Sequence, residues 1–309
     1  MSTVAPRADA AAASVGATDL FVLRRVSGNR FVHFGGSGRG SGWAGLIEVA
    51  ADEEGSLRDA LATRRPARHT HGGKELVFGP YYAQAAAFVP VTNDVVVVFG
   101  GEDAMTSATD EALQAAATLA ADAVESITPA KKLADELEEL DAVRAAMAVD
   151  AATVEETMRA LALVVAEALS CEVGAVYLAD GDRVEVVDRG WKLNESRAQV
   201  GAALKSVLGD GRFPYCVQDA AVLPLPSPLD SERGIRSYYL LELTGVARGV
   251  LFVAHTDAAP RGFTLLCRRL GLRLAEVASA VLGIAVTREW IGAESARLQS
   301  AFSELEEAE

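Results

Sequence analysis

The chain has 309 residues, a formal net charge of −14, and a composition that is half hydrophobic but only 6% aromatic. This length exceeds what a single core usually fills, so we predict two domains of about 100 to 150 residues each. The negative charge repels nucleic-acid phosphates and anionic lipid, and this excludes direct nucleic-acid binding as an expectation. The three cysteines, Cys171, Cys216 and Cys267, show no CxxC spacing. We therefore expect neither disulfides nor a zinc site, and a reducing cytoplasm fits the chain best.

The N-terminal segment, residues 1–17, is rich in alanine and lacks the basic and leucine-rich regions of a signal peptide. We predict it to be a disordered tail. The longest apolar stretch, Leu274 to Val286, is interrupted by Glu276 and followed at once by Arg288 and Glu289. It is too short and too polar to span about 30 Å of hydrocarbon, so no membrane segment is predicted.

Residues 18–126 are predicted to form a first domain of strands and turns. Alternating apolar segments flank short turns and predict two hairpins, Phe21–Val26 with Arg30–Phe34 and Ala85–Pro90 with Asp94–Phe99. The glycine-rich stretch Gly35–Gly42 lacks the lysine of a phosphate-binding loop, and a flexible surface loop is expected there.

Two histidines in this domain, His69 and His71, would point to one face of a strand, as a pair of metal or haem ligands does. The chain has only four histidines, and a solvated loop explains the pair more simply.

Residues 127–149 are predicted to form a helical linker, within a helix-forming stretch that is broken at Pro129. Its larger side chains recur at spacings of four, three, four and three: Leu133, Leu137, Leu140, Arg144 and Met147. This spacing is typical of a short coiled-coil seam. The alternative is that the same leucines pack on a neighbouring domain.

Residues 150–287 repeat the first domain in outline. Two strand pairs, Val173–Ala179 with Arg183–Arg189 and Ser237–Leu243 with Gly249–His255, are separated by an amphipathic helix over Ser196–Leu208. A long helix follows from about Phe263. This repetition is the internal indication of a tandem.

The second domain resembles the C-terminal half of a GAF domain. The resemblance lies in Gly234-Ile235-Arg236-Ser237, the strands Tyr238–Leu243 and Gly249–Val253, and Phe263-Thr264 opening a helix. It covers about Asp150 to Arg288, with Arg268 where the family usually has an acidic residue. The first domain resembles the family in architecture only, and it could equally be PAS-like or degenerate.

The resemblance implies an α+β fold: each domain has a five- or six-stranded antiparallel sheet with flanking helices and a ligand pocket on one face. By analogy, six residues of the second domain line that pocket, namely Trp191, Tyr215, Cys216, Asp219, Arg236 and Tyr238. Core packing explains each of them equally well.

Known ligand signatures of the family are incomplete in this sequence. Asn194-Glu195 is the segment most similar to the cyclic-nucleotide signature, but it lacks the other residues of that signature. No cysteine is next to a histidine, as it is in bilin-binding members. No cofactor is identified. Because no catalytic motif occurs either, the chain is predicted not to be an enzyme.

The last segment, residues 288–309, extends an apolar stripe that begins in the second domain. The stripe keeps a three-four spacing through Val281, Ile284, Arg288, Ile291, Ser295, Leu298, Phe302 and Leu305. This period of 3.5 residues predicts a coiled coil, and hence a homodimer. The alternative is a single long helix packed on its own domain.

These observations together predict a cytoplasmic, non-catalytic sensory or regulatory module. It would bind a small molecule or a partner in a GAF pocket and transmit this through dimeric helices. The alternative is a GAF-fold dimerisation or adaptor protein without a small-molecule ligand that regulates a separate output protein. The chain would either act on such a partner or be part of a longer protein.

Overall fold

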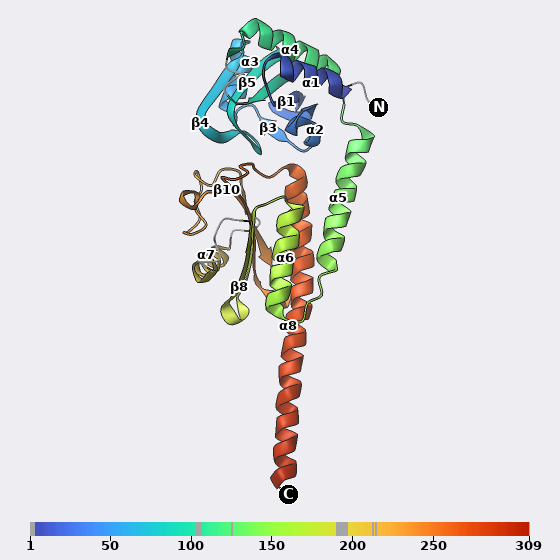
Figure 1. The fold of residues 1–309 in the computed structure, drawn as a ribbon, viewed down its shortest axis with the longest axis vertical. Helices are drawn as coiled ribbons and strands as arrows, with labels where there is room; N and C mark the ends of the chain where they lie inside the picture. Colours follow the sequence, from blue (N-terminus) through green and yellow to red (C-terminus); the bar gives the residue numbers. More distant parts are fainter. Residues whose placement is uncertain are drawn as a thin grey trace. The chain divides into compact units, whose positions relative to one another are not determined.

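The computed structural model describes residues 4–102, 107–124, 126–189, 197–211, 213 and 215–308. Its α+β chain divides into two compact units, each with one antiparallel sheet (Figure 1). Unit 1 comprises Met1–Leu137 and Pro260–Leu266; unit 2 comprises Glu138–Ala259 and Cys267–Glu309. These bounds differ from the predicted domains, because the division falls within the linker helix α5 (Pro129–Met147) and the C-terminal segment continues a helix of unit 2.

Unit 1 contains a six-stranded sheet with the order β3-β2-β1-β6-β5-β4. The strands are β1 (Asp19–Ser27), β2 (Arg30–Ser37), β3 (Glu48–Ala50), β4 (Ala67–Phe78), β5 (Tyr81–Thr92) and β6 (Val95–Gly101). Both predicted hairpins are present, as β1–β2 and β5–β6. Helices α1 (Val4–Ser14) and α4 (Asp110–Ala123) share a core with one sheet face, and α3 (Gly55–Thr63) packs on the other.

The N-terminal segment is not the predicted disordered tail. Residues Val4–Ser14 form α1, and Ala11, Ala12 and Val15 belong to the core that α1 builds with α4. Small alanine side chains let the two helices approach closely. The helix is therefore buried although it lacks the large apolar side chains by which an amphipathic helix is usually identified.

The glycine-rich stretch is also packed rather than loose. Gly36 lies in β2 and Gly40 in α2 (Arg39–Gly42), and a Cβ at either position would collide with the carbonyl oxygen of Leu20. The glycines are therefore explained by close backbone approach and not by a mobile loop.

Unit 2 contains a five-stranded sheet with the order β8-β7-β11-β10-β9. Its strands are β7 (Val173–Leu178), β8 (Arg183–Asp188), β9 (Tyr215–Val217), β10 (Ile235–Leu243) and β11 (Gly249–Thr256). Three helices complete it: α6 (Val154–Ala168), α7 (Arg197–Asp210) and α8 (Leu265–Ala308).

The helices of unit 2 cover both faces of its sheet (Figure 1). The apolar side of α7 shares a core with one face through Val200 and Leu204. On the other face two glycines admit the remaining helices: a Cβ on Gly174 would lie 2.6 Å from the carbonyl oxygen of Ala162 in α6, and one on Gly271 of α8 would lie 2.5 Å from the Tyr239 ring. The face opposite α6 and α8 carries α7.

The two units follow the same chain path. Without the short strand β3, the order in unit 1 is β2-β1-β6-β5-β4, and the order in unit 2 is β8-β7-β11-β10-β9. In each sheet the first strand therefore lies between the second strand and the last strand. In both units a helix precedes the first strand, at least one helix lies between the second strand and the last three, and a helix follows the last strand. The two sheets are thus alike in strand order, while the tandem of two GAF-like domains stays a prediction.

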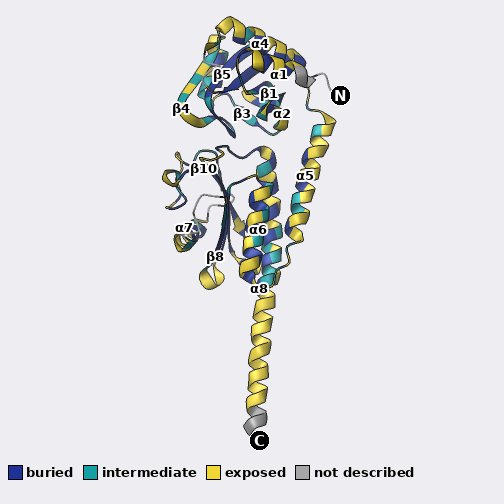
Figure 2. Cartoon of the chain, viewed as in Figure 1, coloured by how far each residue is buried: buried dark blue, intermediate teal, exposed yellow. Residues whose placement is uncertain are grey.

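Helix α8 runs through unit 2 from Cys267 onward and ends outside the core of that unit. Leu266, Leu270, Leu274, Leu282 and Val286 are buried, whereas every residue from 287 to 304 is exposed (Figure 2). Among the described residues α8 is the one helix long and apolar enough to cross a membrane, with a window of mean hydropathy 1.6 that is 39% buried. Core helices of soluble proteins pass the same test, so this finding is weak evidence for a span.

Candidate functional site

Tyr215 and Tyr238 lie together on the α7 face of unit 2. Strand β9 pairs with β10 so that Tyr215 faces Leu240 and Val217 faces Tyr238. Directly paired residues share a sheet face, and the two tyrosine rings are 6.2 Å apart. The Tyr238 hydroxyl donates a hydrogen bond to the Leu223 carbonyl at 2.8 Å. These two predicted pocket residues are therefore neighbours.

Cys216 is directed to the opposite face of the sheet. It pairs with Tyr239, whose hydroxyl donates to the Arg268 carbonyl of α8 at 3.0 Å. Burial raises the pKa of the Cys216 thiol to about 11, and the nearby Arg268 side chain only partly offsets this effect. Because successive strand residues alternate between faces, Cys216 does not line a pocket with Tyr215 and Tyr238.

Two further predicted pocket residues, Asp219 and Arg236, have polar contacts elsewhere. The Asp219 carboxylate accepts a hydrogen bond from the backbone of Ala221 at 2.9 Å, and Arg236 forms an ion pair with Asp257. Arg236 stands at a register shift in β10, which is where a strand residue can turn away from both faces. Trp191 lies outside the described residues.

The α7 face is filled by its own side chains in the described part of unit 2. Its buried cluster includes Tyr177, Val200, Leu204, Tyr238 and Phe252. A small molecule bound among these side chains would have to displace packed groups.

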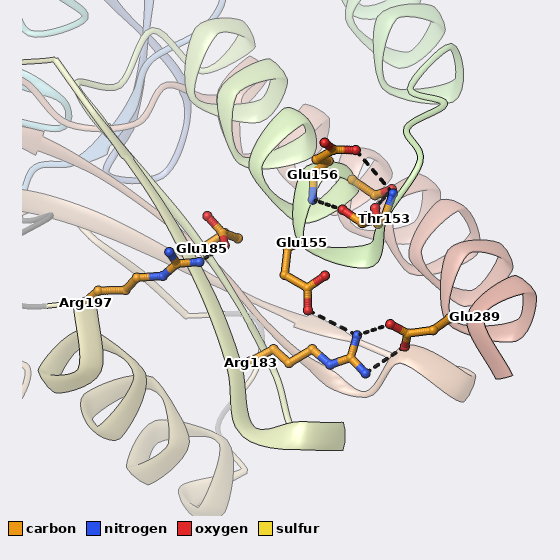
Figure 3. A network of polar contacts seen from close by, with 8 residues as sticks. Thr153, Glu155, Glu156, Arg183, Glu185, Arg197 and Glu289 are labelled. Carbon is orange, nitrogen blue, oxygen red and sulfur yellow. Dashed lines mark hydrogen bonds and ion pairs between the residues drawn. The ribbon is translucent and has the colours of Figure 1, made fainter. Parts of the chain in front are cut away.

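A polar network connects α6, β8 and α8 where α8 leaves the core (Figure 3). The Arg183 guanidinium donates to both carboxylate oxygens of Glu289, at 3.1 and 2.7 Å, and to Glu155 at 3.3 Å. This bidentate hydrogen bonding raises the pKa of Arg183, with Glu289 the largest contributor. One arginine of β8 therefore holds α8 beside the first turn of α6.

A second arginine group surrounds Glu185, two residues further along β8. Its carboxylate is 4% exposed and contacts Arg197 at the start of α7 (Figure 3). It also contacts Arg159 of α6, at 3.1 Å. The N-terminus of α6 is fixed by a capping box between Thr153 and Glu156. Strand β8 thus connects the helix on one face with the helices on the other.

Two hollows lie beside α8 at the same level. A groove of about 590 Å³ is lined by Val246, Gly283, Ile284 and Ile291, among others, and a second of about 220 Å³ is lined by Met147 and Asp150. Both are also lined by Ile284 and Arg288, so these side chains form a ridge between two hollows. Arg288 donates to Asp150 at 2.8 Å.

The structure places the predicted dimer helix residues on an exposed stripe. Val281 is half-buried, whereas Ile284, Ile291, Leu298 and Phe302 are between 54 and 66% exposed. Arg288 is also exposed, and the side chain of Leu305 lies outside the described residues. The stripe is therefore not packed on its own unit.

One arrangement in unit 2 has the order of a catalytic thiol, base and carboxylate. Cys171 Sγ is 3.7 Å from His255 Nε2, and His255 Nδ1 is 3.6 Å from Glu172 Oε2. Cys171 is 2% exposed and His255 is 1% exposed. A reactive cysteine needs contact with its substrate, so this burial is typical of a structural group.

Sequence reasoning missed Arg183, Glu185 and Glu289. Arg183 and Glu185 lie in a predicted strand and Glu289 in the predicted C-terminal helix, and the partners of these residues are up to 106 residues away. No local spacing could have found them. His69 and His71 do lie on a strand, β4, with rings 4.7 Å apart, but no group of three metal-ligating side chains occurs among the described residues.

No family model and no curated protein matches this sequence. Solved structures similar to it include the GAF domain of an Acinetobacter phosphoenolpyruvate-protein phosphotransferase, at 17% identity and a TM-score of 0.37 over 48% of this chain and 95% of that one. The GAF domain of a Coxiella burnetii phosphoenolpyruvate-protein phosphotransferase has 15% identity and a TM-score of 0.39, over 51% and 97%. The GAF domain of the cyanobacteriochrome TePixJ has 17% identity and a TM-score of 0.32, over 45% and 98%.

GAF domains are thus what this chain resembles in fold, as its GIRS-like segment and the β10–β11 hairpin indicate. At these TM-scores and identities the likeness carries no further argument about ligand, activity or partner.

Proposed function

We propose that the chain is a non-catalytic regulatory module that transmits a signal through paired α8 helices. The observation that carries this proposal is the exposed half of α8. Its residues 287–304, beyond the last buried position, Val286, are all exposed and keep an apolar stripe of period 3.5.

An unpaired helix of this kind is expected to be unstable in water. Isolated helices of about 12 to 15 residues are marginal even with favourable sequences, and Gly292 lowers the helix propensity of this one further. Pairing with a second copy would bury Ile291, Leu298 and Phe302 in one seam. Arg288 and Ser295 at seam positions would lower stability and restrict the register.

The input to this module is a small molecule or partner acting on the α7 face of unit 2. The Arg197–Glu185 contact joins α7 to β8, and Arg183 joins β8 to α8. The alternative, an adaptor without a small-molecule ligand, is favoured by the filled α7 core. We place either protein in the cytoplasm, because the three cysteines are free thiols.

The test is the dimer dissociation constant of the full chain, measured by sedimentation equilibrium. Ile291→Glu with Leu298→Glu is expected to weaken the dimer by about 100-fold or more, because both apolar seam contacts are lost. Ala293→Glu with Ser300→Glu adds the same charge to another side of the same helix and is the matched control. A monomeric wild-type chain, or equal effects of the two variants, would refute the pairing. Native mass spectrometry separates the two functions, since a co-purifying small mass supports a sensor and a bare dimer an adaptor.

A further inference from the structure

Strand β4 brings two imidazole rings together at the edge of the unit 1 sheet. β4 is the last strand in the order of that sheet, beside β5. Ala67 of β4 packs on the core that contains α3, and side chains two residues apart on a strand share a face. His69 and His71 therefore lie on this same side, and their ring centres are 4.7 Å apart. Both residues are half-buried, so the pair can be reached from water.

Glu75 determines which nitrogen of His71 is free to bind. His71 Nδ1 lies 2.8 Å from Glu75 Oε2, and because an ionised carboxylate only accepts hydrogen bonds, Nδ1 carries the proton. In the neutral ring the lone pair is then on Nε2. Nε2 is buried and has no hydrogen-bond partner, although buried polar atoms are normally paired. A carboxylate that holds one nitrogen of a histidine and leaves the other free is the usual arrangement behind a metal-ligating histidine.

The distance between the two rings suits one shared ion. With tetrahedral angles and Zn–N bonds of about 2.0 to 2.1 Å, two imidazoles on one zinc ion have ring centres about 5 Å apart. Burial lowers the pKa of His69, and the neighbouring His71 acts in the same direction, so His69 is in the neutral form that ligates a metal. The guanidinium of Arg68 lies 2.6 Å from the Asp110 carboxylate, which offsets its repulsion of a cation.

We propose that His69 and His71 bind a divalent transition-metal ion, with His71 ligating through Nε2 and Glu75 positioning its ring. Imidazole nitrogen favours Zn²⁺, Ni²⁺ and Cu²⁺ over Mg²⁺ and Ca²⁺, which prefer oxygen ligands. Two side chains leave the other coordination positions to water. There is open space for it beside His71, because a Cβ on Gly72 or Gly73 would meet nothing within 4 Å. The site lies within unit 1 and does not depend on helix pairing.

The test is Zn²⁺ binding to the full chain, measured by isothermal titration calorimetry at pH 7.5 with Mg²⁺ as the comparison ion. We expect one Zn²⁺ site that Mg²⁺ does not fill, and its loss in the double variant His69→Gln with His71→Gln. Glu75→Gln keeps the shape of the side chain and is expected to raise the dissociation constant by about 10- to 100-fold. Glu53→Gln removes another exposed carboxylate of unit 1 and is the matched control, with an unchanged constant expected.

Spectra of the histidine ring nitrogens identify the ligating atom. Zn²⁺ should shift the ¹⁵N signal of His71 Nε2 and leave Nδ1 protonated. The other two histidines of the chain, His33 and His255, are 0 and 1% exposed, so they do not compete for the ion.

Three results would overturn the proposal: Zn²⁺ binding that survives in the double histidine variant, equal constants for Glu75→Gln and Glu53→Gln, or binding without a shift of either histidine ring. Circular dichroism melts check that the variants are folded. The Glu75 side chain is 57% exposed, so Glu75→Gln decides the question even if the histidine variant unfolds.

Discussion

Glu185 offers the sharpest test of the network around β8. Its carboxylate is 4% exposed and is held by Arg159 of α6 and Arg197 of α7. Glu185→Gln keeps the shape of the side chain and removes its charge. Both arginines stay partly in water, with side chains 63 and 42% exposed, so they regain hydration when the carboxylate is lost.

The expected loss of stability follows from the contrast between the buried carboxylate and its two partly exposed arginine partners. A hydrogen bond to a charged group contributes about 1.5 to 3 kcal/mol, but partner exposure reduces this value. Loss of a fully buried pair costs about 3 to 5 kcal/mol. We therefore expect Glu185→Gln to lower the free energy of unfolding of unit 2 by about 2 kcal/mol. For a unit of this size this corresponds to a fall in Tm of roughly 4 to 8 °C.

The assay is urea unfolding of the full chain, in which the unfolding transition of unit 2 is measured. The matched control is Glu167→Gln in α6, whose ion pair with Arg189 has both side chains more than half exposed. Its loss is expected to cost less than about 0.5 kcal/mol. If the two variants lose the same stability, burial of the Glu185 carboxylate is not what makes this contact important.

Three further predictions concern single residues. His33 is fully buried and desolvation lowers its pKa to about 4, so the unfolded chain binds the extra proton between pH 6.5 and 4. Unit 1 should lose about 3 kcal/mol of stability as the pH falls through this range, and His33→Gln should remove that part of the slope in urea titrations. Cys216, with its pKa raised to about 11, should react with iodoacetamide at pH 7.5 roughly 100-fold more slowly in the folded than in the unfolded chain; equal rates by peptide mass spectrometry would contradict its burial. Gly174→Ala should destabilise unit 2 by about 1 to 3 kcal/mol because its Cβ meets the Ala162 carbonyl, whereas Gly283→Ala, with open space around it, should be neutral or stabilise α8 by up to about 1 kcal/mol; a similar melting shift for both would refute the close approach of α6.

The sequence predicted the elements whose signals are local. The hairpins β1–β2 and β5–β6, the linker helix and the exposed α8 stripe all follow from turn residues and periodicity. It could not predict α1, because an alanine-rich segment has no apolar stripe to recognise until another alanine-rich helix is beside it. The pocket residues were predicted by analogy with the family, and strand alternation then separated Cys216 from Tyr238. The arginine contacts of β8 depend on partners from three helices, and only the assembled sheet brings these together.

Strand β10 suggests how a signal could pass between the two faces of unit 2. Tyr238 belongs to the α7 core, and the next residue, Tyr239, hydrogen-bonds to the backbone of α8. A ligand that shifts the packing around Tyr238 therefore acts on a strand that also holds α8. Such a ligand can change helix pairing only by its difference in affinity for the two helix states, which is about 1 to 3 kcal/mol in typical allosteric proteins. This free energy corresponds to a change of roughly 5- to 150-fold in the dimer dissociation constant. Tyr239→Phe, which removes only the hydroxyl, should reduce that change without altering the α7 core.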